Sequence, residues 1–182
     1  MNVLCALAVL AAAPDEVAKP QPEPVALGTG PRLRLGAGFR SAGGTANGFD
    51  MLGFSAHLGV QANDHVAVYG LLQGGASLGS ASFGVAAVAE VAPLDWFALG
   101  LGLGTMTVTM QGQPASLTPL DATAFGLPAR LTFMFGRSVE PGQYRNRFYV
   151  AVDSFMGVRP FAPTSIESFV WSAGLSLGYQ LM

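Results

Sequence analysis

The side chains in this sequence that could do chemistry are few, and their spacing defines no known reaction. His57 follows Ser55 by two positions, a pair that a hydrolase could use. No acidic residue stands beside the pair at a recognisable spacing, and general acid–base catalysis needs such groups within hydrogen-bond reach. The sequence also lacks the spacings of metal ligands, phosphate-binding loops and cysteine nucleophiles. We therefore predict no catalytic residue, no metal site and no cofactor.

The composition favours a chain that meets lipid. Charged residues make up 11% of the 182 residues, whereas soluble domains carry about 25%, and the mean hydropathy is +0.43. Glycine, serine, threonine or a charge interrupts every apolar run before the roughly 18 residues that a membrane helix needs. Because only helices and closed barrels span a bilayer, a barrel is predicted. A net charge of −2 offers no basic patch for nucleic acid.

The last segment of the chain, residues 169–181, has two chemically different faces. Its two-residue period is typical of a β-strand. The bulky face consists of Phe169, Trp171, Ala173, Leu175, Leu177, Tyr179 and Leu181. The smaller, uncharged face consists of Val170, Ser172, Gly174, Ser176, Gly178 and Gln180. This pattern predicts a narrow barrel with lipid outside and a tight interior.

The same period recurs between turn residues that suit antiparallel hairpins. It predicts an all-β, eight-stranded antiparallel up-and-down transmembrane β-barrel, with strands over residues 32–40, 52–61, 66–74, 83–91, 97–104, 125–136, 147–156 and 169–181. The intervening loops include 41–50, 111–121 and 137–146. In the third strand, the residues expected to point outward are Val66, Val68 and Leu72, and those expected to point inward are Tyr69 and Gln73.

The charged residues test these faces independently, because the faces were drawn from apolar residues alone. Every charge within a predicted strand falls on the small-residue face, and these charges are Arg32, Arg34, Arg40, Glu90, Arg130, Arg147 and Asp153. A charge on the lipid face costs about 2–4 kcal/mol at the bilayer midplane. We therefore predict a charge network in the lumen, formed by Arg34, His57, Glu90, Arg130 and Asp153.

The turn before the seventh strand predicts one contact within this network. If that turn is centred on residues 141–142, Arg130 lies opposite Asp153 on the neighbouring strand. An unpaired charge in a confined lumen is costly. We predict an Arg130–Asp153 salt bridge that closes the lumen and is shared with Glu90 and Arg34.

Three further expectations concern single side chains. Pairing residues in the same way across the first hairpin places Arg34 opposite His57. We interpret His57 as a hydrogen-bonded lumen residue. His65 lies in a predicted turn, where we expect it to be solvated. Pro128 removes a ladder donor, so it should lie at a bulge or a local bend.

Aromatic residues of the outer rows fall into two groups that suit the two membrane interfaces. The group expected at one rim consists of Phe39, Phe54, Phe83, Phe125 and Trp171. The group expected at the other rim consists of Trp96, Phe97, Phe135, Phe148 and Tyr179.

The N-terminal part divides into two segments before the barrel, which is predicted over residues 31–182. Residues 1–13 contain a short apolar run that ends in small residues and includes Cys5, the single cysteine. Such a run is typical of a secretory signal peptide, although a buried first strand is the alternative. Residues 14–30 are rich in proline and carry mixed charges, which predicts a flexible lead-in.

From residue 32 to 182 the chain resembles the small eight-stranded outer-membrane barrels of Gram-negative bacteria, the superfamily of the membrane domains of outer-membrane proteins A and X. In that family the last strand carries an assembly signal of polar, any, glycine, any, any, hydrophobic, any, aromatic residues. The matching residues here are Ser172, Gly174, Leu177 and Tyr179. The resemblance implies a cell outer-membrane location with both termini in the periplasm. It also implies contact with lipid and lipopolysaccharide, recognition by the outer-membrane assembly machinery, and a monomer.

Eight strands leave an interior that side chains fill. We therefore predict a structural or surface-interaction role without catalysis, and a narrow gated, porin-like channel is the alternative. The resemblance also includes barrel enzymes that modify lipid A, but the sequence around His57 lacks the spacing of their deacylase motif. A soluble lipocalin-like carrier would need a bulky apolar interior, whereas the inner rows here are glycine, alanine, serine and arginine.

Overall fold

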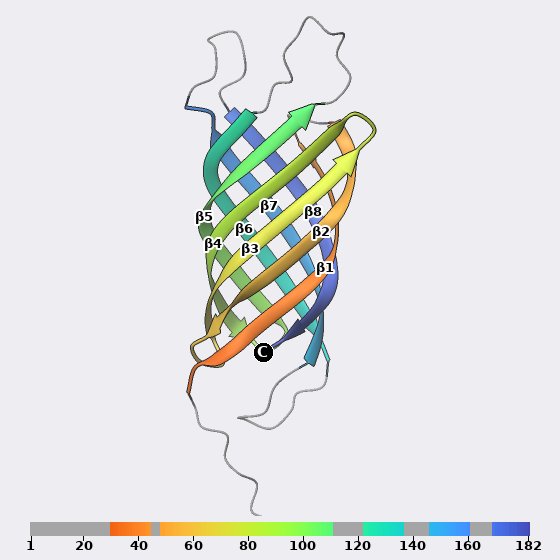
Figure 1. The fold of residues 1–182 in the computed structure, drawn as a ribbon. Coiled ribbons are helices and arrows are strands. Elements are labelled where there is room, and N and C mark those ends of the chain that lie inside the picture. The colour runs from red at the N-terminus through yellow and green to blue at the C-terminus, as the bar shows by residue number, and fades with distance from the viewer. Residues whose placement is uncertain (1–29, 45–47, 111–121, 137–145, 161–168) are drawn as a thin grey trace, which may run out of the picture.

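The computed structural model describes residues 30–44, 48–110, 122–136, 146–160 and 169–182, and these residues form a closed antiparallel barrel in which each strand pairs with its neighbours in sequence (Figure 1). The strands are β1 (Arg32–Gly44), β2 (Gly48–Gln61), β3 (Val66–Ser77), β4 (Ser80–Leu94), β5 (Phe97–Met110), β6 (Ala122–Phe135), β7 (Asn146–Val158) and β8 (Phe169–Leu181). The pairing of β1 with β8 closes the barrel. The predicted all-β, eight-stranded fold is therefore confirmed.

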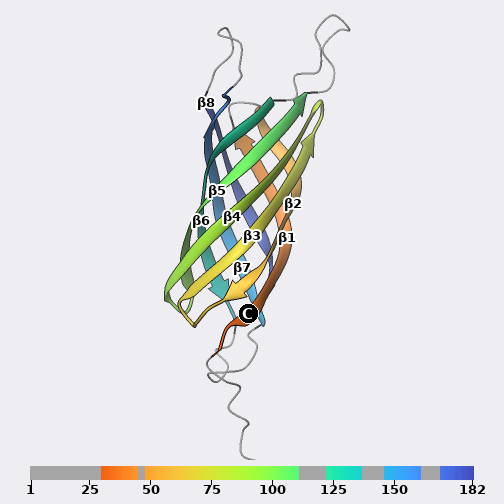
Figure 2. The same cartoon turned by 60° about the vertical axis from the view of Figure 1, so that its left-hand side comes forward.

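The strands are strongly inclined to the barrel axis, as two views of the ribbon show (Figures 1 and 2). The residue pairing explains the inclination. A path that goes once around the barrel, from each residue to its partner on the next strand, does not return to the residue where it began. That path runs through Arg32, Gln61, Ala67, Glu90, Gly100, Arg130, Asp153, Gly174 and Ala42. It returns to β1 ten residues beyond its start. Such a stagger requires tilted strands and sets the width of the barrel.

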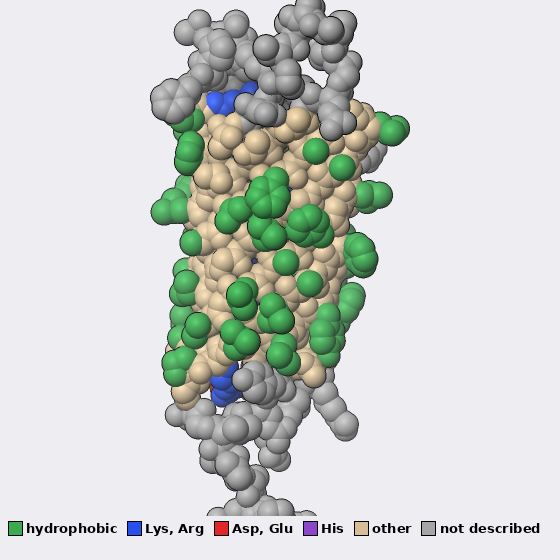
Figure 3. All heavy atoms as spheres, in the orientation of Figure 1, with side chains coloured by type: hydrophobic (Ala, Val, Ile, Leu, Met, Phe, Trp, Pro, Cys, Tyr) green, Lys and Arg blue, Asp and Glu red, His purple; other side chains and the backbone are tan. Residues whose placement is uncertain are grey.

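The outer and inner faces of the wall have opposite chemistry. Large apolar side chains are exposed along the outside, for example Leu101 (68%) and Leu103 (70%). In the view of Figure 3, hydrophobic side chains are distributed over the whole height of the wall, and arginine is seen only at its two ends. The inner rows carry the buried polar and charged residues, among them Arg34, Glu90 and Gln180. A soluble barrel has the reverse arrangement, so the structure supports a lipid-facing exterior.

One end of the barrel, the lower end in Figure 1, carries the C-terminus and two tight turns. In the β2–β3 turn, Asn63 Oδ1 accepts hydrogen bonds from the backbone N–H groups of His65 and Val66, both at 2.8 Å. His65 is exposed, as expected, and its Nδ1 also lies 2.9 Å from the carbonyl oxygen of Ala92. The β3–β4 turn lies at the opposite end, and Gly79 there has a positive φ of 104°, which favours glycine.

The strands are longer than the sequence-based expectation, since β3 and β4 also include residues 75–77 and 80–82, and Pro128 differs from it as well. Residues 41–44 and 48–50, predicted as loop, extend β1 and β2, because their pairing continues to Gly44 and Gly48. Pro128 introduces no bulge, since the β5–β6 register is the same on both sides of it, with Leu101 paired to Ala129 and Gly104 to Gly126. The ladder is instead interrupted between these two pairs, because proline has no N–H group to donate.

Other expectations on the strands agree with the structure or lie outside its described part. Val66 and Val68 are exposed while Tyr69 is buried, as predicted for the third strand. The predicted signal peptide and most of the lead-in fall outside the described residues, as do the loops 111–121 and 137–145. Among the described residues, no helix is long and apolar enough to cross a membrane.

Candidate functional site in the barrel lumen

A buried ion pair links β1 to β4 in the lower half of the lumen. Arg34 Nη1 lies 2.6 Å from Glu90 Oε1, and both side chains are 2% exposed. The hydroxyl of Tyr69 donates to the second oxygen, Glu90 Oε2, at 2.7 Å. Arg34 also donates to Gln61 Oε1 and Gln180 Oε1, each at 3.3 Å. Both carboxylate oxygens of Glu90 therefore have partners, which a buried charge requires.

The expected pairing of Arg34 with His57 is wrong. Arg34 is the register partner of Gly59, and His57 is the partner of Gly36. The glycine-rich hairpin is centred one residue later than the count assumed, and this moves every cross-strand pair by two positions. Both side chains still point into the lumen, because a shift by two preserves the face.

A second ion pair links β6 to β7. Arg130 and Asp153 are register partners, which confirms the predicted pairing across this hairpin. Arg130 Nε lies 3.6 Å from Asp153 Oδ1 and donates to Thr132 Oγ1 at 3.3 Å. Asp153 Oδ2 accepts a hydrogen bond from the hydroxyl of Ser176 on β8. The prediction that this pair shares its charges with Glu90 and Arg34 is not supported, because those two residues form their own pair.

His57 lies between the two ion pairs, in a layer of aromatic rings. Its ring centroid is 5.2 Å from that of Tyr69 and 5.8 Å from that of Tyr149. The guanidinium of Arg34 lies 4.8 Å from the Tyr69 ring, and that of Arg130 lies 5.1 Å from the Tyr149 ring. Each cation thus stacks on one tyrosine, a contact that stabilises buried arginine.

His57 is buried in the lumen, and its ring interacts with the side-chain amide of Gln180 by hydrogen bonding, as expected. Ser55 Oγ lies 3.4 Å from the hydroxyl of Tyr149 instead. The ring packs against Gly36, where an added Cβ would lie 2.2 Å from a ring carbon. A serine activated by this histidine would need a direct contact, which the structure does not contain.

Apolar side chains pack in the lumen on both sides of the charged residues. The cluster toward the lower end consists of Ala92, Ala98, Met134 and Met182. The cluster toward the other end consists of Ala124, Phe155 and Val170, with Met106 packed against it. A cavity of about 20 Å³ lies at the lower end beside Arg32, Arg34 and Arg147, which is room for about one water molecule. Side chains therefore fill the lumen, as expected for eight strands.

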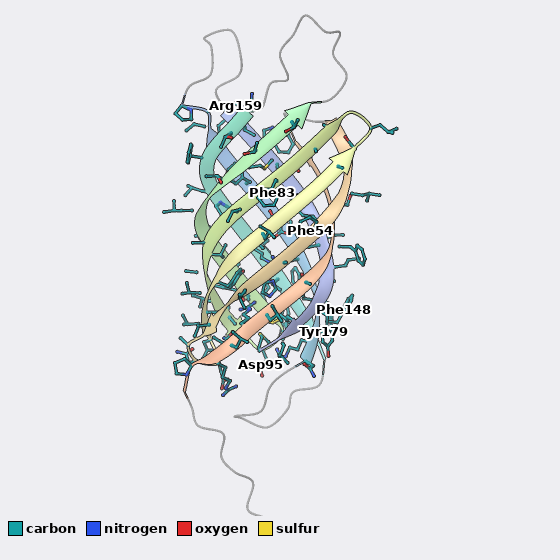
Figure 4. All side chains as sticks on the ribbon, in the orientation of Figure 1. Phe54, Phe83, Asp95, Phe148, Arg159 and Tyr179 are labelled. Carbon is teal, nitrogen blue, oxygen red and sulfur yellow. The ribbon has the colours of Figure 1, made fainter. Side chains whose placement is uncertain are left out.

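The predicted interface aromatics lie on the outer face of the barrel, although Phe54 lies near the middle of its height and not at a rim. Phe54 and Phe83 lie well above Phe148 and Tyr179 along the barrel (Figure 4). The exposed members and their exposed fractions are Phe39 82%, Phe54 46%, Phe83 49%, Phe125 53%, Trp171 37%, Trp96 55%, Phe135 54%, Phe148 49% and Tyr179 54%. Phe97 is half-buried, since its ring contacts those of Trp96 and Phe133 at 5.8 and 5.3 Å.

The four residues of the predicted assembly signal alternate across the wall of β8. Leu177 and Tyr179 point outward and are 44% and 54% exposed. Ser172 is buried and accepts a hydrogen bond from Arg40 at 3.4 Å. An added Cβ at Gly174 would lie 2.7 Å from the carbonyl oxygen of Ser41, so the β1–β8 seam has no space for a side chain there.

The lumen contains partners that the predicted charge network left out. Tyr69, Tyr149 and Gln180 contact its charged members and are at most 2% exposed. The sequence did contain a signal for these three residues, because each is a large polar residue on an inner row that otherwise consists mainly of small residues. Among the described residues, no three metal-ligating side chains come together.

The fold and its lumen define an eight-stranded antiparallel barrel of the outer-membrane type. Similar solved structures are those of Ail, the attachment invasion locus protein of Yersinia pestis, in complex with the heparin analogue sucrose octasulfate, and of the outer-membrane protein OprG of Pseudomonas aeruginosa. The Ail match has a TM-score of 0.50 and 14% identity and covers 83% of this chain and 98% of Ail. The OprG match has a TM-score of 0.50 and 9% identity and covers 84% and 95%. No family model and no curated protein sequence matches the chain.

Proposed function

We propose that this chain is an outer-membrane protein with a structural or surface-interaction role and a lumen closed by its own side chains. The reversed distribution of polarity carries this proposal, because exposed leucine and phenylalanine surround buried arginine, glutamate and aspartate. A bilayer hides the apolar exterior, and the filled interior leaves no path for open diffusion. The fold shared with two outer-membrane barrels supports this location.

Refolding tests the membrane assignment. Residues 31–182, made without the N-terminal segment, should aggregate in buffer and refold in detergent or lipid to a β-rich, protease-resistant form that migrates differently with and without boiling. Insertion into vesicles in one step is the expected result. A stable, monodisperse monomer in plain buffer would contradict the proposal and favour the soluble carrier.

A narrow channel is the second candidate, because charged side chains continue through the middle of the lumen. Conductance across a planar bilayer decides between the two. The closed lumen predicts no unitary current from the refolded protein, whereas discrete openings would favour the channel. We assign no catalytic activity, since the hydroxyl of Ser55 contacts Tyr149 and not His57.

We further propose that the last strand is read by the outer-membrane assembly machinery and that the protein is a monomer that contacts lipid and lipopolysaccharide. Tyr179 is exposed on the outer face of β8, where an assembly factor can reach it. Tyr179→Ala should lower the amount of folded protein in the outer membrane severalfold and leave refolding in detergent unchanged. Phe148→Ala, which alters the aromatic partner of Tyr179 on β7, is the matched control. Equal loss in both variants would argue against a signal in β8.

A further inference from the structure

A shallow groove lies on the outer wall of the barrel between β5 and β6. Its volume is about 420 Å³, which is in the range of sites that hold small molecules. The residues that line this β5–β6 groove are Leu103, Gly104, Thr105, Phe125, Gly126 and Leu127. Its large apolar side chains belong to the outer rows and are exposed. The groove therefore opens toward lipid and not into the lumen.

Bare backbone forms the floor of the β5–β6 groove. Gly104 and Gly126 are register partners, so neither strand contributes a side chain at this level. Directly below them the ladder is interrupted beside Pro128, which has no N–H group to donate. Leu103 and Leu127 lie at the interrupted level and are 70% and 55% exposed. The seam therefore presents two large apolar side chains next to a floor that consists of glycine.

Hydroxyl groups mark the upper limit of the β5–β6 groove. Thr107 and Thr123 form the next outer pair above Thr105 and Phe125. Thr107 Oγ1 lies 2.9 Å from Thr123 Oγ1 on the exposed surface. Below the groove, the outer row of β5 over residues 97–103 is phenylalanine and leucine. The groove therefore lies at the upper edge of the apolar wall, where an apolar surface meets a pair of hydroxyl groups.

We propose that the β5–β6 groove holds one acyl chain of lipopolysaccharide, with the hydroxyl groups of Thr107 and Thr123 toward its sugar headgroup. This inference rests on the proposed function, which surrounds the wall with the outer membrane. It also rests on the expected periplasmic position of the C-terminus, which puts the upper end in the leaflet that contains lipopolysaccharide. An acyl chain is narrow enough to enter the groove, whereas the broad wall of a second barrel is not. Other chains of the same molecule pack on the neighbouring apolar wall and strengthen the binding.

Methyl NMR tests where the chain binds on the refolded barrel. Residues 31–182 are refolded in deuterated detergent, and protonated lipid A, the acylated part of lipopolysaccharide, is added. The methyl groups of Leu103 and Leu127 should show saturable NOEs to the chain methylenes. Those of Leu58, which is 57% exposed on β2, should show none. Phosphatidylethanolamine, titrated in the same way, should have a dissociation constant about tenfold higher than that of lipid A.

Thr105→Trp is the decisive variant, because it places a large ring in the groove from the outer row and leaves the inner row unchanged. We expect it to refold and to raise the dissociation constant for lipid A about tenfold. Ala173→Trp is the matched control, since it adds the same side chain at an exposed position on the outer face of β8. This control should leave the dissociation constant unchanged.

Equal dissociation constants for lipid A and phosphatidylethanolamine would overturn the proposal in favour of ordinary boundary lipid. Unchanged affinity in Thr105→Trp, or an equal loss in Ala173→Trp, would exclude the groove as the site. If Thr105→Trp does not fold, the NOEs of the unmodified protein decide, since equal signals at Leu58 and Leu103 would also exclude it. A barrel that refolds but binds no lipid A refutes this inference alone, whereas failure to refold in detergent refutes the proposed function.

Discussion

The two buried ion pairs should differ in how much they stabilise the barrel, and double-mutant cycles can measure this difference. In one cycle, Arg34→Met and Glu90→Gln are made singly and together. In the other, Arg130→Met and Asp153→Asn are combined in the same way. Each cycle isolates the interaction between its two side chains from the other effects of the substitutions.

The contact distances set the expected order. At an effective dielectric constant of about 20, unit charges attract by about 6 kcal/mol at the 2.6 Å of the Arg34–Glu90 contact and by about 5 kcal/mol at the 3.6 Å of the Arg130–Asp153 contact. Loss of hydration cancels much of this attraction. We expect coupling energies of about 2–3 kcal/mol for the first pair and about 1 kcal/mol for the second.

The single variants should lose more stability than the coupling energy alone, about 3–5 kcal/mol each, because each leaves a buried charge without its partner. Glu90→Gln should be the mildest of them, since its amide oxygen can still accept the Tyr69 hydroxyl that now lies 2.7 Å from the carboxylate. Unfolding by urea in detergent micelles, at one fixed ionic strength, gives the free energies. Additive losses in the Arg34–Glu90 cycle, or a larger coupling in the Arg130–Asp153 cycle, would refute this reasoning.

Two further predictions concern the packing and the orientation of the barrel. Gly36→Ala should destabilise the fold by about 1–3 kcal/mol, because the new Cβ would lie 2.2 Å from the ring of His57; Gly70→Ala on the outer face, where the nearest atom is 3.7 Å away, should be close to neutral in the same urea titration. In a chain whose native cysteine is replaced by serine, Leu78→Cys in the β3–β4 turn should react with an impermeant thiol reagent on whole cells, and Asn63→Cys should react only after disruption of the outer membrane, whereas the opposite result would reverse the orientation.

The fold was predictable because its strongest signal does not depend on any tertiary contact. A two-residue period places each side chain on one of two faces, and the charges then identify which face avoids lipid. Arg34 and Asp153 lie far apart in the sequence, and both were assigned to the inner face; both are buried in the lumen. The cost of a charge in lipid acts on each strand separately, so the faces of one strand can be assigned without the others.

Cross-strand register was predictable only where the turn was marked. Proline and glycine at 141–142 locate the centre of one hairpin, and the Arg130–Asp153 pair follows from it. The first hairpin has glycine at 43, 44 and 48, which offers more than one possible turn position, and the count for Arg34 and His57 was off by two positions. A shift by two keeps every residue on its face, which is why the faces were correct while the contact was not.

Contacts across the lumen lie beyond sequence reasoning altogether. Arg34 reaches Glu90 on β4, although the strands between them place neither residue opposite the other. Such contacts depend on the stagger of the barrel, which brings residues of different strands to the same height. The period of the sequence reports which face a residue occupies and contains no information on that height.

The layers of side chains in the lumen determine which substitutions could open a path for ions through the barrel. The Arg34–Glu90 and Arg130–Asp153 pairs are anchored on different strands, and the rings of Tyr69, Tyr149 and His57 lie between them. Loss of one pair leaves the other pair and the rings in place, so a single substitution should weaken the barrel without opening it. A current that appears only when both pairs are removed would show that each closes the lumen independently, and the apolar clusters at either end would then be the remaining barrier.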